Sequence, residues 1–297
     1  MSSIRRYDLL RSRLDKFTRM LPGVETGDTA AVHRTRVASR RLRELLPVLE
    51  LDHSVSRKLN RRLKKLSRRL GTVREPDVLV QLVDELRQGG RIPDRALRRV
   101  GDAARKAGDE ARGRLSHKNV AADLERAAKK LEAIAVQLEE ADTGRSRSRA
   151  WRWAIDARVA RRAATLKQAI RDAGSMYVPD RVHTVRLALK KLRYGLEVSA
   201  DAAGVKRSPD VRTLKRGQEL LGRLRDFQVL IERVRKGQAS VTAPDVAAWR
   251  ELDAMVTLLE HHCRRLHARY VRDRVALMAL CDRLGGRASA AAVRRAG

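Results

Sequence analysis

Two short segments of the chain place a histidine ahead of arginines and lysines at helical spacing. Residues 32–43 read VHRTRVASRRLR, and residues 182–194 read VHTVRLALKKLRY. At 100° per residue, one stripe of each helix holds the same residue types: His33, Arg36, Arg40 and Arg43, and then His183, Arg186, Lys190 and Arg193. Arginine presents a planar fork to phosphate oxygens, lysine a mobile charge, and histidine a donor that can be protonated beside an anion. The two stripes therefore favour phosphate binding.

The two segments belong to a longer internal repeat. The histidine segments match at an offset of 150 residues, and LKKLSRRLGTVREPDVL (63–79) aligns with LKRGQELLGRLRDFQVL (214–230) at an offset of 151. The sequence thus predicts two copies of one helical unit, joined near residues 142–148. We expect a first unit over 1–141, a second over 149–285 and a loose tail over 286–297.

The helix after each histidine segment carries a second basic stripe opposite a row of leucines. Its members in the first copy are Arg57, Arg61, Lys64 and Arg68, and part of the stripe persists in the second copy as Arg212 and Lys215. These residues are further candidates for anion contact. No catalytic, metal-ligating or cofactor-binding residue is predicted.

Ordinary solvated helix faces, or the arginine bias of a GC-rich genome, are the alternative explanation of the stripes. The charge is local, however. Residues 29–74 hold 14 Lys and Arg against three Asp and Glu, and residues 179–225 hold 12 against five. Like charges one helical turn apart cost stability unless an anion neutralises them. Anion binding is the better explanation for two matched stripes.

The elements that position these stripes are all helical, because Ala, Leu, Arg and Glu dominate and period-two β patterns are missing. The predicted helices are 4–20, 29–51, 54–70, 76–88, 94–115, 118–141, 149–173, 180–203, 209–222, 225–238 and 244–284. Pro47 lies inside a helical pattern, so we expect a kink or early stop there. In the last helix a heptad seam containing Trp249, Cys263 and Tyr270 is expected to face the core.

The net charge of the chain indicates the class of ligand that it binds. The chain has 297 residues, 43% of them hydrophobic, with a formal net charge of +31. A protein with such a charge is expected to bind a polyanion, such as a nucleic acid, an anionic membrane or a phosphate polymer. Two cysteines give no disulfide framework, and no apolar run reaches the ~18 residues of a membrane span. We expect a cytoplasmic protein that does not enter membranes; the sequence leaves its oligomeric state open.

The paired motifs resemble the CHAD family (conserved histidine α-helical domain). Each H-x2-R-x3-[RK]-[RK]-L-R element is followed by an L-G-x-[VL]-R-[DE] turn, and the resemblance covers nearly the whole chain. It implies two four-helix-bundle-like halves related by pseudo-twofold symmetry around a central basic cavity that binds inorganic polyphosphate, with polyphosphate granules as one place of action. The family usually has an R-D-x-D turn, whereas this chain has Arg74-Glu75-Pro76-Asp77 and Arg225-Asp226-Phe227-Gln228. Asp77 and Asp226 are expected to cap or tether helices.

Two other functions compete with a non-catalytic polyphosphate-binding domain. Non-specific nucleic-acid binding fits the charge, but nine aromatic residues offer little for bases to stack on. An enzyme acting on phosphate polymers would lack a Walker loop, an E-x-E-x-K strand element and an acidic metal cluster. Whether the two histidines touch the ligand or only position their helices is left open.

Overall fold

The fold is helical throughout the parts that the structure describes. The computed structural model describes residues 4–90, 92–141, 145–205, 208–239 and 245–296. Within these ranges, only the backbone is described for residues 145–150 and 287–296. Within these ranges no strand occurs, and the all-α prediction is confirmed. The helices are α1 (Arg6–Thr18), α2 (Leu21–Glu25), α3 (Thr29–Leu45), a 3-10 turn (Leu46–Val48), α4 (His53–Gln88), α5 (Asp94–Arg114), α6 (His117–Ala141), α7 (Arg145–Ala173), α8 (Pro179–Ala202), α9 (Pro209–Ala239) and α10 (Val246–Ala296).

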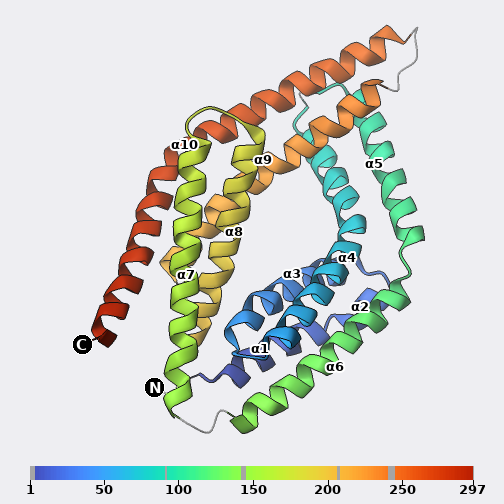
Figure 1. The fold of residues 1–297 in the computed structure, drawn as a ribbon. Coiled ribbons are helices and arrows are strands. Elements are labelled where there is room, and N and C mark those ends of the chain that lie inside the picture. Colours follow the sequence, from blue (N-terminus) through green and yellow to red (C-terminus); the bar gives the residue numbers. More distant parts are fainter. Residues whose placement is uncertain (1–3, 91, 142–144, 206–207, 240–244, 297) are drawn as a thin grey trace.

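The helices pack in two groups that meet through α3 and α8 (Figure 1). In the first group α1 contacts α3 and α6, and α4 contacts the same two helices. In the second group α7 contacts α8 and α10, and α9 contacts the same two helices. Helix α5 packs against α4 and α10 and so joins the groups at the other end. The histidine-bearing helices α3 and α8 therefore lie at the contact between the groups.

Two hydrophobic clusters form the core, and both draw on each half of the sequence. The larger cluster contains residues such as Leu42, Leu63, Leu166 and Leu192. The smaller cluster is made by the C-terminal part of α4, by α5, by the C-terminal part of α9 and by the first half of α10. The change of cluster falls between Val73 and Leu79 on α4, and between Leu224 and Phe227 on α9. The two long helices therefore act as struts between the two cores.

The predicted breaks within α4 and α9 were wrong. Helix α4 continues through Gly71 and Pro76, and α9 continues through Gly222, so the expected turn is part of a helix in both copies. A proline inside a helix removes one hydrogen bond and bends the chain. Pro76 is buried where α4 packs against Gly108 of α5. We attribute the continuity of α4 to this packing, since the helix propensity of proline alone would end the helix there.

Other expectations about the helices had mixed outcomes. Helix α3 ends at Leu45 before the 3-10 turn containing Pro47, as predicted. On α10, Cys263 and Tyr270 are buried as expected, but Trp249 is 47% exposed. The buried stripe instead runs through Ala248, one residue earlier, so the first turn presents Trp249 to solvent. Residues 286–296, expected as a loose tail, continue α10 as helix.

Candidate functional site

Helices α3 and α8 bury their apolar faces, and parts of their basic stripes come together where the two helices meet. Asp28 caps α3 by accepting a hydrogen bond from the backbone N–H of Ala31 at 2.6 Å, and Pro179 opens α8 at its first position. The faces predicted to be apolar are buried: Thr35, Ala38, Leu42, Leu45, Leu46 and Leu49, and then Val185, Ala188, Leu189, Leu192 and Leu196. The helical geometry worked out from the sequence is thus confirmed.

Four cations from the two stripes converge where α3 meets α8, and we call Arg36, Arg40, Arg186 and Lys190 the central cluster. Arg40 lies close to the other three, and its positive charge therefore lowers the pKa of each of them. Burial is the largest cause of these shifts, and it lowers the pKa of Arg36 to about 10. Lys190 has the strongest change: burial, then Arg40, Arg186, Arg36 and Arg193, lower its pKa to about 7. The cluster is therefore a concentration of positive charge partly withdrawn from water.

A central cavity of about 290 Å³ opens beside this cluster, between α3, α4, α8 and α9. Its polar lining consists of Arg36, Arg74, Glu75, His183, Arg186, Arg225 and Asp226. Gly71 also lines it, and a Cβ there would lie 3.3 Å from the Arg36 guanidinium, so glycine lets that arginine lie against α4. Arg74 and Arg225 were absent from the predicted set of binding residues. Their matching positions in the two copies of the repeat were the signal that could have identified them.

The two acids expected to cap or tether helices have different environments. Asp77 accepts a hydrogen bond from Arg112 Nη1 at 3.0 Å and so tethers α4 to α5. Asp226 lies inside α9 and caps nothing. Burial raises the pKa of Asp226, while Arg186, Arg223, Arg74 and Arg225 lower it. Asp226 therefore offsets part of the positive charge of the central cavity.

The two histidines lie in different cavities. His183 lines the central cavity, whereas His33 lines a cavity of about 360 Å³ with Arg13, Lys16 and other residues of α1 and α3. Burial, followed by nearby arginines, lowers the pKa of both imidazoles below 6.5. Arg74 is the largest charged contributor at His33, so this histidine still lies at the edge of the central charge.

The last arginine of each stripe already has a hydrogen-bond partner. Arg43 Nε donates to Asn60 Oδ1, and Arg193 Nε donates to Gln218 Oε1, both at 2.8 Å. Arg193 also forms an ion pair with Glu197. The equivalent residues in the two copies therefore differ: Arg193 is paired with a carboxylate, whereas Arg43 is held by a neutral amide.

Six of the predicted residues lie on exposed faces outside the central cavity. They are Arg57, Arg61, Lys64 and Arg68 on α4, and Arg212 and Lys215 on α9. Arg68 is close enough to Arg43 to lower its pKa, and Lys215 lies 3.7 Å from Glu219 in an exposed ion pair. The structure therefore brings together the middle two residues of the α3 and α8 stripes and leaves the second basic stripe, on α4 and α9, at the surface.

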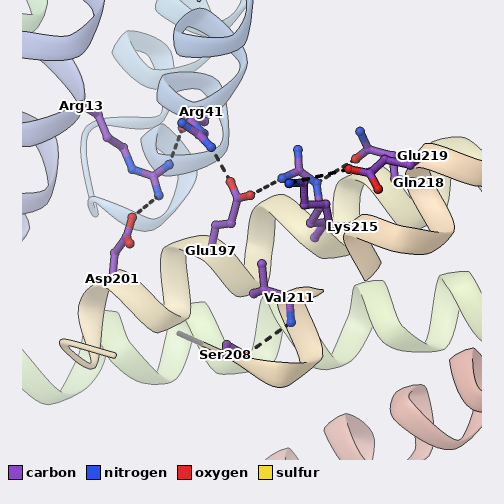
Figure 2. Close-up of polar contacts among 10 residues, drawn as sticks. Arg13, Arg41, Glu197, Asp201, Ser208, Val211, Lys215, Gln218 and Glu219 are labelled. Carbon is purple, nitrogen blue, oxygen red and sulfur yellow. Dashed lines mark hydrogen bonds and ion pairs between the residues drawn. The ribbon is translucent and has the colours of Figure 1, made fainter. Parts of the chain in front are cut away.

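Ion pairs fix α8 against the first group of helices (Figure 2). Arg13 Nη2 donates to Asp201 Oδ2 at 2.7 Å, and its Nη1 donates to the backbone carbonyl of Arg41 at 2.9 Å. Arg41 Nε in turn donates to Glu197 Oε2 at 3.3 Å. Arg13 is only 6% exposed, so these contacts satisfy a buried charge. They hold α3 and α8 in the register that produces the central cluster.

The described residues contain no group of three or more His, Cys, Asp or Glu that could hold a metal ion. Cys263 and Cys281 are free and buried, and burial raises the pKa of both thiols. None of the described helices is long and apolar enough to cross a lipid bilayer.

Fold and site together define an all-helical protein, over the residues that the structure describes, with a partly buried basic cluster between two packed groups of helices. Comparison with known proteins agrees with this class. The model of the CHAD domain family matches residues 8–235, and the chain belongs to the CHAD family.

A solved structure supports the fold independently. The chain resembles the crystal structure of the CHAD domain from the plant Ricinus communis with a TM-score of 0.57 and 22% sequence identity, over 93% of this chain and 90% of that chain. At this identity the likeness shows the fold alone. Among curated proteins no match was found.

Proposed function

We propose that this chain binds inorganic polyphosphate, without catalysing its turnover, at the central cluster and the adjoining cavity. Membership of the CHAD family supports this ligand, because the family consists of polyphosphate-binding domains. The observation that carries the proposal is the convergence of Arg36, Arg40, Arg186 and Lys190 from two helices that are distant in sequence. A polymer with one negative charge per phosphate matches such a cluster.

Unsatisfied nitrogens at the same place point to an anion. Arg36 Nε, Arg186 Nε and His183 Nδ1 belong to the buried side-chain atoms that have no hydrogen-bond partner in the described part of the chain. Buried polar atoms normally have partners, because an unpaired one costs about 1–3 kcal/mol. Phosphate oxygens beside these three side chains would accept the missing hydrogen bonds. Their negative charge would also balance the positive charge of the two arginines.

We propose that the exposed basic residues of α4 and α9 extend the binding site beyond the central cavity. Arg57, Arg61, Lys64 and Arg68 continue the positive surface on the first half, and Arg212 and Lys215 continue it on the second. We propose that the two halves, related by a pseudo-twofold axis, present these surfaces to successive phosphates of one polymer. The place of action would be the cytoplasm, including polyphosphate granules.

Nucleic acid is the second candidate, because two tryptophans are exposed at the surface. Trp153 is 50% exposed and Trp249 is 47% exposed. Single-stranded binders combine such aromatic side chains with a basic groove. The tryptophans lie on α7 and α10 and not in the central cavity, so they support surface contact with a strand more than binding inside the protein.

A competition experiment distinguishes the two ligands. Labelled long-chain polyphosphate is bound at ~0.15 M salt and challenged with unlabelled polyphosphate, duplex DNA or single-stranded DNA at matched phosphate concentration. We expect polyphosphate to compete well and both DNAs poorly. Equal competition by DNA would leave only a non-specific basic surface.

A pair of charge variants locates the site. Arg186→Gln/Lys190→Gln should weaken polyphosphate binding at least about tenfold. Lys129→Gln/Lys130→Gln removes the same charge from an exposed part of α6 and should change affinity less than about twofold. Equal losses in the two variants would show that net charge alone binds the polymer.

A further inference from the structure

A further cavity lies on the opposite face of α9 from the central one, where α4, α9 and α10 meet. Its volume is about 560 Å³, within the range of small-molecule sites. Arg223 and Phe227 line it, whereas Arg225 and Val229 of the same helix line the central cavity. The residues that α10 contributes lie beyond residue 235, where the match to the CHAD family model ends. We call this cavity the α10 pocket.

Two arginines give the α10 pocket an unmatched positive charge. Arg265 and Arg269 lie four residues apart on α10, so their side chains project from the same face, and both line the pocket. In the part of the chain that the structure describes, neither forms an ion pair with a carboxylate. Arg223 completes the basic side but pairs with Glu85 at 2.5 Å. A ligand anion would thus have two arginine forks available without displacing an existing ion pair.

The rest of the lining is apolar or aromatic, which distinguishes this pocket from a site for an inorganic polymer. Apart from Gly89 and Glu85, the carboxylate that pairs with Arg223, it comprises Leu86, Ile92, Phe227, Leu258, His262 and Leu266. The ring of His262 stacks on Phe227 with centroids 5.4 Å apart and an interplanar angle of 16°. A bare phosphate chain would leave this wall without a partner. A ligand that fills the whole pocket must carry an apolar, planar body next to its negative charge.

We propose that the α10 pocket binds a phosphorylated nucleoside, with its phosphates on Arg265 and Arg269 and its base against the wall formed by Leu258, His262 and Leu266. This site is separate from the one proposed for polyphosphate. The base supplies the flat, weakly polar surface that the wall requires, and arginine pairs with phosphate through two parallel hydrogen bonds.

Calorimetric titration of the full chain carrying Arg186→Gln/Lys190→Gln, in which the site proposed for polyphosphate is weakened, with ATP, adenosine and inorganic tripolyphosphate at ~0.15 M salt tests the ligand class. We expect ATP to bind at least about tenfold more tightly than either part, because only ATP satisfies both the arginines and the wall. Tripolyphosphate binding as tightly as ATP would show that the apolar wall takes no part, and would overturn the proposal.

Matched variants place the nucleotide on α10. Arg265→Gln/Arg269→Gln should weaken ATP binding about tenfold or more while long-chain polyphosphate binding stays within about twofold. Arg264→Gln/Arg272→Gln removes the same charge from exposed positions of α10 outside the pocket and should leave both ligands unaffected. Two outcomes would refute binding of ATP in the α10 pocket. One is that ATP binding survives in Arg265→Gln/Arg269→Gln. The other is that ATP binding is lost in Arg186→Gln/Lys190→Gln, which would assign ATP to the central cavity. Loss of polyphosphate binding in the latter variant tests the proposed function separately.

Discussion

The depressed pKa of Lys190 makes polyphosphate binding dependent on pH in a defined window. Burial and four neighbouring arginines lower this pKa from 10.5 to about 7 in the ligand-free protein. A bound polyanion would neutralise the arginines and return the pKa of the amine toward its usual value. The complex then holds the proton that the free protein gives up above pH 7, so binding weakens as the pH rises.

The size of the effect follows from these two pKa values. With a pKa of about 7 in the free protein and one above about 9 in the complex, affinity falls about fivefold between pH 7 and pH 8, or about 1 kcal/mol. Proton uptake on binding rises from about 0.5 at pH 7 to about 0.9 at pH 8 by the same linkage. The pKa values of His33 and His183 lie below 6.5 in the free protein, so protons that these imidazoles take up on binding affect the affinity chiefly below pH 7.

Calorimetric titrations in buffers of different ionisation enthalpy measure both quantities. Lys190→Met should bind more weakly at pH 7, with a flat profile from pH 7 to 8, whereas Lys129→Met on the exposed face of α6 should keep the wild-type profile. Without ligand, Lys190→Met should also raise the free energy of unfolding at pH 6 by about 1–3 kcal/mol, because the charged amine is costly in the folded state. This gain should shrink toward pH 9, where folded Lys190 is already neutral. A wild-type affinity that does not change between pH 7 and 8 would refute the coupling.

Three further outcomes are expected. Arg43→Ala should weaken polyphosphate binding about fivefold and Arg193→Ala less than twofold, because Arg193 is already paired with a carboxylate; equal effects in a binding titration would argue against this asymmetry. Asp201→Asn should lower the free energy of unfolding by about 1–3 kcal/mol in chemical denaturation, because it leaves the buried α1 arginine without its counter-charge, and an unchanged midpoint would contradict that. NMR titration should show the depressed pKa values of His33 and His183 rising when polyphosphate binds, with tighter binding at pH 6 than at pH 8; unchanged pKa values, with normal binding by a double glutamine variant, would leave the lysines and arginines as the whole site.

The composition and the period of the apolar pattern were enough to predict helices and their buried faces. Leu42 and Leu192 were predicted to be buried and are fully buried. Such predictions succeed because the 3.6-residue period of a helix decides locally which side chains share a face. The repeat also located the motif helices and with them the residues of the central cluster.

The tertiary structure decided what local rules could not. Pro76 and Gly222 are usual signs of a helix end, yet packing on both sides keeps α4 and α9 continuous across two cores. Trp249 fits a heptad by sequence but is 47% exposed at the start of α10.

The residue types and spacing of the stripes determined that this protein would concentrate positive charge on two helices, because helical geometry is local. Which of those charges meet was decided by the contact between α3 and α8, two segments about 150 residues apart in the chain. That contact buries Lys190 among arginines, adds Arg74 and Arg225 to the cavity, and leaves Lys64 and Lys215 in solvent. Burial and charge proximity depend on distances between segments that no single helix specifies, and they set the electrostatics of the site.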